Sequence, residues 1–77
     1  MEELLAYLAR QLVDHPESVS VQRHDRPGGE LVLELRVAED DLGKVIGRGG
    51  RVARALRTVV KASAVGSGRR VHVEIGA

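Results

Sequence analysis

Gly43-Lys44-Val45-Ile46-Gly47-Arg48-Gly49-Gly50-Arg51 is the stretch that decides how this chain folds. A short apolar segment runs into a four-residue loop, residues 47–50, of which three are glycine. Glycine adopts backbone conformations that other residues avoid, and it lets a ligand come close to the backbone. The segment that follows, residues 51–65, contains no Gly, no Pro and no acidic residue. It therefore predicts a helix that begins at the loop.

The start of such a helix is suited to an anion. The first N–H groups of a helix have no partner within it, and its dipole is positive at this end. Arg48 in the loop and Arg51 just after it add positive charge. The stretch therefore predicts a phosphate-binding site.

Length and composition restrict the fold and the chemistry. The 77 residues make one domain, residues 1–77, with a modest core. There is no cysteine and no spacing of metal ligands, so neither a disulfide nor a metal or other cofactor is expected. Dimerisation is one remaining way to bury more surface.

The N-terminal sequence and the hydropathy pattern argue against membrane insertion. No apolar run approaches the roughly 20 residues that span a bilayer. The chain starts with Glu2-Glu3 and has neither a basic region nor an apolar segment of the signal-peptide kind. We expect a cytoplasmic protein.

Charge is unevenly distributed along the chain. Residues 1–43 carry four basic and ten acidic side chains, whereas residues 44–77 carry eight basic and one acidic. This asymmetry predicts one electropositive surface on an otherwise acidic body. The alternative interpretation is a helix face that is simply solvated.

The periodicity of apolar residues predicts six elements. They are a helix at 2–14, strands at 18–25 and 30–37 around a turn at 26–29, helices at 39–46 and 51–65, and a strand at 70–75. The second and third strands are joined by two helices, which suits a parallel pair. The expected fold is α+β, with a three-stranded mixed sheet and three helices on one face.

The helix expected at 51–65 has two different sides. Arg51, Arg54, Arg57 and Lys61 fall within an arc of about 120° at roughly 100° per residue. This basic stripe continues from Arg48, and Lys44 extends it. Apolar residues occupy the opposite side: Val52, Leu56, Val59 and Val60.

The run Val45-Ile46-Gly47-Arg48-Gly49-Gly50 resembles the Val-Ile-Gly-x-x-Gly signature of the KH domain. This RNA-binding module clamps the backbone of four nucleotides with its GXXG loop. The expected α-β-β-α-α-β order is similar to the type II, bacterial KH topology. The chain length and the run at 54–62 resemble the small stand-alone bacterial KH proteins of the KhpA family, over essentially the whole chain.

The resemblance implies non-catalytic binding of single-stranded RNA, as an RNA chaperone or post-transcriptional regulator. The residues it assigns to RNA are Lys44, Val45, Ile46, Gly47, Arg48, Gly49, Gly50, Arg51, Val52 and Arg54. Gly47 to Gly50 would contact phosphate, and Val45, Ile46 and Val52 would form an apolar groove. Family loops usually carry a second polar residue where this chain has Gly49. The apolar and alanine-rich faces of the helix at 51–65 offer a seam for a homodimer, and the resemblance implies a heterodimer with a larger KH-containing protein.

The sequence also bears on four alternatives to RNA binding through a KH domain. An enzyme is disfavoured, because the three histidines have no partner at a telling spacing. Nucleotide loops of the GxxxxGK[ST] and GxGxxG kinds fail on Val45 and Val52 respectively. Stacking RNA modules need exposed aromatics, and this chain has one Tyr and no Phe or Trp. A protein-interaction module built on the alanine-rich helix stays open as the alternative.

Overall fold

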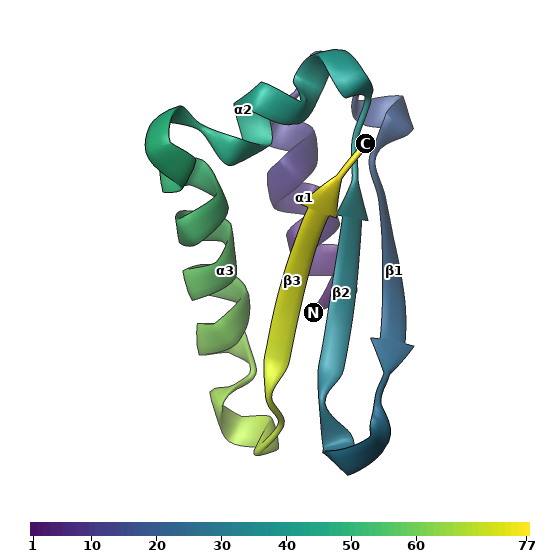
Figure 1. Ribbon diagram of the computed structural model, residues 1–77, viewed down its shortest axis with the longest axis vertical. Helices are drawn as coiled ribbons and strands as arrows, with labels where there is room; N and C mark the ends of the chain where they lie inside the picture. The colour runs from purple at the N-terminus through teal and green to yellow at the C-terminus, as the bar shows by residue number, and fades with distance from the viewer.

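The computed structural model describes residues 1–77 as three helices and a three-stranded sheet (Figure 1). The elements are α1 (Glu2–Leu12), β1 (Ser20–Asp25), β2 (Leu31–Arg36), α2 (Leu42–Ile46), α3 (Arg51–Ser63) and β3 (Val71–Gly76). Short 3₁₀ turns join them, including Glu39–Asp41 before α2 and Arg48–Gly50 before α3. None of the helices has both the length and the apolar character that a membrane-spanning helix needs.

The sheet has the order β1-β2-β3. β1 pairs antiparallel with β2 as a hairpin, and β2 pairs parallel with β3 across the crossover that contains α2 and α3. Helix α1 lies behind the sheet, while α3 runs alongside the edge strand β3 (Figure 1). This arrangement confirms the predicted α+β fold, the mixed sheet and the placement of the helices on one face.

One face of the sheet packs on the helices and forms the core. The fully buried apolar side chains come from every layer: Leu5, Leu31, Leu33, Leu35, Val45, Val60 and Val73. The alternation of Leu31, Leu33 and Leu35 places all three on the helix-facing side of β2. Burial of this face is the main favourable term for a chain of this size.

Val32 is the apolar exception on the outer face of β2, and it is only 2% exposed. Its direct cross-strand neighbours are His24 on β1 and His72 on β3. These two exposed side chains flank Val32 on the central strand. Val32 therefore lies between two histidines on the outer face of the sheet.

Several predicted boundaries were too generous. Helix α1 ends at Leu12 rather than residue 14, and α3 ends at Ser63 rather than residue 65. The predicted helix at 39–46 is a 3₁₀ turn followed by five α-helical residues. Within this turn the Asp41 side chain is buried and accepts hydrogen bonds from the chain just after α1.

Candidate nucleic-acid interface

The loop Gly47–Gly50, here called the GXXG loop, joins α2 to α3. Gly47, Gly49 and Gly50 all have positive φ, at 75°, 64° and 79°. At Gly47 a Cβ would lie 2.5 Å from Val52 Cγ2 and 2.9 Å from the Val52 backbone nitrogen. At Gly49 a Cβ would meet nothing within 4 Å. Gly47 therefore lets the loop turn against α3, and Gly49 is open to a ligand.

Three hydrogen bonds hold the loop in place. The Gly47 N–H donates to Gly43 O at 2.9 Å, which ends α2, and the Gly50 N–H donates to Gly47 O at 3.1 Å. Arg54, which lies in the first turn of α3, donates from Nη1 to Gly49 O over 2.9 Å. The resemblance assigns Arg54 to RNA; in the structure its side chain holds the loop through this bond.

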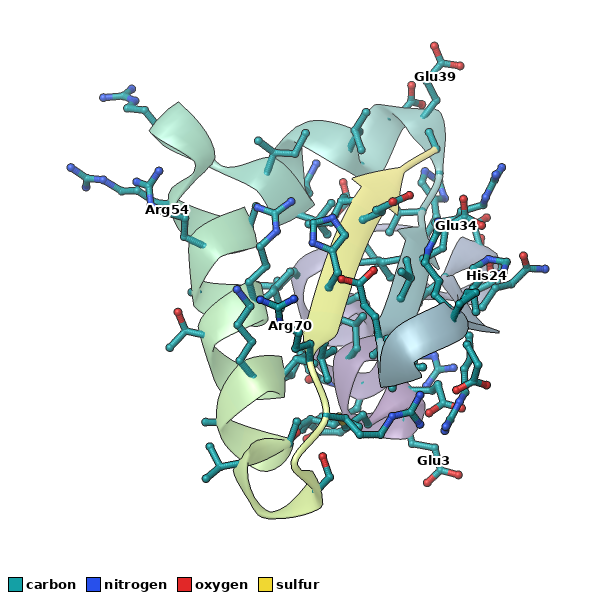
Figure 2. The ribbon with its side chains drawn as sticks, turned by 60° about the horizontal axis from the view of Figure 1, so that its bottom comes forward. Glu3, His24, Glu34, Glu39, Arg54 and Arg70 are labelled. Atoms are coloured by element: carbon teal, nitrogen blue, oxygen red, sulfur yellow. The ribbon has the colours of Figure 1, made fainter.

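Exposed cations surround the loop. Arg48, Arg51 and Arg54 are all exposed, and none of them forms an ion pair with an acidic side chain within 4 Å. In Figure 2, Arg54 extends outward from the end of α3 next to the loop. These unpaired charges are free to meet phosphate oxygens.

Lys44 differs from these arginines. Its Nζ lies 3.1 Å from Asp14 Oδ2 and 3.8 Å from Asp41 Oδ1. The hydrogen bond to Asp14 is the main reason that the pKa of Lys44 is raised. The prediction placed Lys44 on a free basic stripe, and the structure instead engages it with two carboxylates.

The three predicted groove residues do not share one surface. Val45 is fully buried in the core, so its side chain has no surface for RNA and instead packs α2 onto the core. Ile46 is 37% exposed beside the loop. Val52 is half-buried and lines a different hollow, between α1 and α3. Only Ile46 keeps an exposed apolar surface next to the loop on the α2 side.

The free edge of β3 carries a contact that sequence analysis missed. Arg57 Nε donates to Val73 O at 3.2 Å, so the α3 stripe touches the strand halfway along its length. This bond joins segments 16 residues apart and satisfies one carbonyl of an unpaired sheet edge. The helical spacing predicted which face of α3 carries Arg57, but it could not predict the hydrogen bond to Val73.

Asp41 was also missed as a structural residue, since acids before a helix have a sufficient local explanation in the dipole. Its carboxylate is buried and accepts the N–H groups of Asp14 at 3.1 Å and His15 at 2.9 Å. Burial alone would raise the pKa of Asp41, but these two N–H groups and the nearby Lys44 charge outweigh it and lower the pKa. The carboxylate thus fastens the end of α1 to the helix that leads into the loop.

Comparison with known proteins gives concordant results. The family model of the KhpA/KhpB KH domain matches residues 2–75. A protein of Treponema pallidum named RNA-binding protein KhpA is 55% identical over 74 residues, covering 96% of this chain and 91% of that protein. The Streptomyces coelicolor protein of the same name is 53% identical over 75 residues, covering 97% of this chain and 90% of that protein.

A solved structure shares the fold. Era, crystallised with MgGDPNP and nucleotides 1506–1542 of 16S ribosomal RNA, superposes with a TM-score of 0.67 at 23% identity. The match covers 97% of this chain and 28% of that chain. At this identity the comparison supports the fold alone. Together with the glycine loop between α2 and α3, the family match shows that the chain belongs to the KhpA/KhpB family of KH domains.

Proposed function

We propose that this protein is a non-catalytic, cytoplasmic binder of single-stranded RNA, acting as an RNA chaperone or post-transcriptional regulator. One observation carries the proposal. An exposed loop with three positive-φ glycines opens into a helix flanked by unpaired Arg48, Arg51 and Arg54. The relatives are named as RNA-binding proteins, which supports the same function here.

The residues in and around the GXXG loop would play different roles in RNA binding. Gly47 to Gly50 would let the RNA backbone approach closely, because Gly49 has open space around its Cα. Arg48 and Arg51 would supply charge to the phosphates, while Arg54 would hold the loop as well as contribute charge. Ile46 would offer an apolar surface to a base. Phosphate contacts of this kind position an RNA without reading its sequence.

The interaction would depend on salt. About three phosphate contacts to a single strand give a slope near −2 in a plot of log affinity against log salt concentration. A slope near zero would mean that the arginines around the loop do not meet phosphate.

The direct test is the double variant Arg48→Asp/Gly49→Asp. It places two negative charges at an exposed loop, and the φ of 64° at Gly49 is one that Asp tolerates better than most residues. Fluorescence anisotropy of a labelled 12-nucleotide RNA is expected to show loss of binding. Circular dichroism is expected to show an unchanged fold.

A matched control is available in the turn between β1 and β2. Arg26→Asp/Gly29→Asp makes the same change in charge at a positive-φ glycine (φ 84°) with nothing within 4 Å of its Cβ position. This variant is expected to keep most of its affinity. Binding by the loop variant that equals wild type would refute the assignment of the loop.

A second candidate function is homodimerisation, and it rests on a separate apolar groove between α1 and α3. The groove encloses about 370 Å³ and is lined by Leu8, Gln11, Leu12, Arg51, Val52, Ala55, Leu56 and Val59. Leu12 and Val59 are 40% and 43% exposed, which is costly for side chains of this kind left in water. A second copy, or a larger KH-containing protein, would cover them.

Light scattering of the purified protein tests this candidate. A dimer mass that returns to a monomer mass in Val59→Glu would support it. A monomer at high concentration would leave the groove to a different partner and would not affect the RNA-binding proposal.

A further inference from the structure

A second basic hollow lies at the opposite end of α3 from the GXXG loop. It is formed where the α3–β3 connection returns to the sheet, and it encloses about 420 Å³. Its charged lining residues are Glu30, Lys61, Arg69 and Arg70. We call it the far hollow. None of these residues belongs to the loop or its immediate surroundings.

The cations of the far hollow are only partly neutralised. Arg69 is engaged, because its Nη2 lies 2.7 Å from Asp25 Oδ1 and its Nε donates to Gly29 O at 3.0 Å. Lys61 and Arg70 are exposed, and no carboxylate lies within 4 Å of either. Glu30 is the single acid in the lining. Two free cations that share one hollow repel each other, and a bound anion would relieve that repulsion.

The far hollow continues the row of cations that starts at the loop. Lys61 lies on the same helical face as Arg54 and Arg57, and it is ten residues, or about 15 Å, along α3 from Arg51. In Figure 2, Arg54 marks the loop end of this row, and Arg70 lies farther along, between β3 and α3. Arg57 bridges the two ends where it contacts the edge of β3.

We propose that the far hollow is a second phosphate site, which Lys61 and Arg70 form for the same RNA strand that the GXXG loop clamps. A GXXG loop holds four nucleotides. A longer strand that followed the α3 side of β3 would bring later phosphates to Lys61 and Arg70. The protein would then select for single strands longer than the clamp itself requires. This inference rests on the proposed RNA-binding function.

The experiment compares RNA lengths. Labelled oligouridines of 4, 8 and 12 nucleotides are titrated with wild type and with Lys61→Gln/Arg70→Gln, at low and moderate salt. The matched control is Arg10→Gln/Arg26→Gln, which removes two exposed arginines outside the far hollow and leaves the same net charge. Both variants gain equally from the extra binding registers of a longer RNA, so that statistical effect cancels.

The proposal predicts a length-dependent loss. The Lys61/Arg70 variant is expected to bind the 12-nucleotide RNA about three- to tenfold more weakly than wild type, and to bind the 4-nucleotide RNA within twofold. Its salt slope on the longer RNA is expected to fall by about 1.4, as two lost phosphate contacts require. The control variant is expected to match wild type at each length.

Three outcomes would overturn the proposal. Equal affinity of the Lys61/Arg70 variant and wild type for the 12-nucleotide RNA would leave the far hollow without an RNA role, and an acidic protein segment would be the better occupant. An equal loss at all lengths would show a general field effect. Absence of binding by wild type at every length would refute RNA binding itself. If instead the 4-nucleotide RNA binds wild type and not Arg48→Asp/Gly49→Asp, the assignment of the GXXG loop stands even where the far hollow fails.

Discussion

At the scale of single residues, Gly47 and Gly49 of the GXXG loop differ in whether they tolerate a side chain. Gly47 combines a φ of 75° and a ψ of 170° with the close approach to Val52. Gly49 has a φ of 64° and open surroundings. The sequence shows both as loop glycines and cannot distinguish them, because the Val52 contact depends on how α3 leaves the loop.

This difference predicts unequal costs for the two alanine variants. Gly47→Ala is expected to lower the free energy of unfolding by about 2–3 kcal/mol, since a strained backbone and a clash with backbone atoms add together. Gly49→Ala is expected to cost about 1 kcal/mol, from its left-handed conformation alone. Urea denaturation measures both. Equal costs would indicate that α3 shifts to accept the Gly47 side chain.

At the scale of elements, α3 is held to the sheet by a polar contact as well as by its apolar side. Arg57→Gln is expected to lower the free energy of unfolding by about 0.5–1.5 kcal/mol, because the bond to Val73 O is lost. Arg51→Gln removes the same charge from an exposed residue without a polar partner, and it is expected to change stability by less than about 0.5 kcal/mol.

Both of these α3 variants are expected to weaken RNA binding by a similar small factor, about two- to fivefold for each lost charge, and for all RNA sequences alike. Thermal denaturation and RNA titration, run in parallel, separate the two effects. A sequence-selective loss in Arg57→Gln would contradict a purely electrostatic role and would indicate that this arginine reads a base.

The elements themselves could be predicted because each carries its own periodicity. The strands, the hairpin and α3 were all found in this way, as was the parallel pair, from the length of the crossover. The start of α2 and the ion pairs of Lys44 could not be predicted, because both involve Asp41 and Asp14, which lie 27 residues apart. Local periodicity holds no information about contacts at that separation.

The candidate site follows the same division. The loop glycines and the arginines of α3 were apparent from spacing. The burial of Val45 and the separation of Val52 from Ile46 were not, because a helix of only five residues can be turned by its neighbours. Lys61 appeared on the predicted stripe, but its partnership with Arg70 required the return of the chain at β3.

At the scale of the whole molecule, acid sensitivity follows from three carboxylates with lowered pKa values. Asp25 owes its lowered pKa chiefly to the Arg23 hydrogen bond, and Glu34 to that of Arg36. In Asp41 burial opposes the shift, and the backbone N–H groups outweigh it. A carboxyl with a lower pKa in the folded state adds stability above its ordinary pKa, and this stability is lost as the pH falls through the folded value.

The melting temperature is therefore expected to be flat from pH 7 to about pH 5 and to fall below about pH 4. Asp25 and Glu34 belong to solvent-accessible ion pairs and contribute little, so Asp41 is expected to dominate. Asp41→Asn should lower the melting temperature at pH 7 by about 5–15 °C, because an amide offers only one acceptor to two N–H groups. It should also flatten the decline in acid. An unchanged acid profile in this variant would assign the sensitivity elsewhere.

The parallel pairing of β2 with β3 has a consequence for the order of assembly. Leu31 pairs with Val71, forty positions later, and the GXXG loop and α3 lie within the chain that this pairing closes. Closing so long a loop is entropically costly before the ladder repays it. Until that step, the Arg57 bond to Val73 and the far hollow that Lys61 and Arg70 share cannot form, so these cations would attract a polyanion by charge alone. RNA added to a refolding protein would therefore bind first by charge and only later through the folded interface. Its effect on the refolding rate would report when the interface forms.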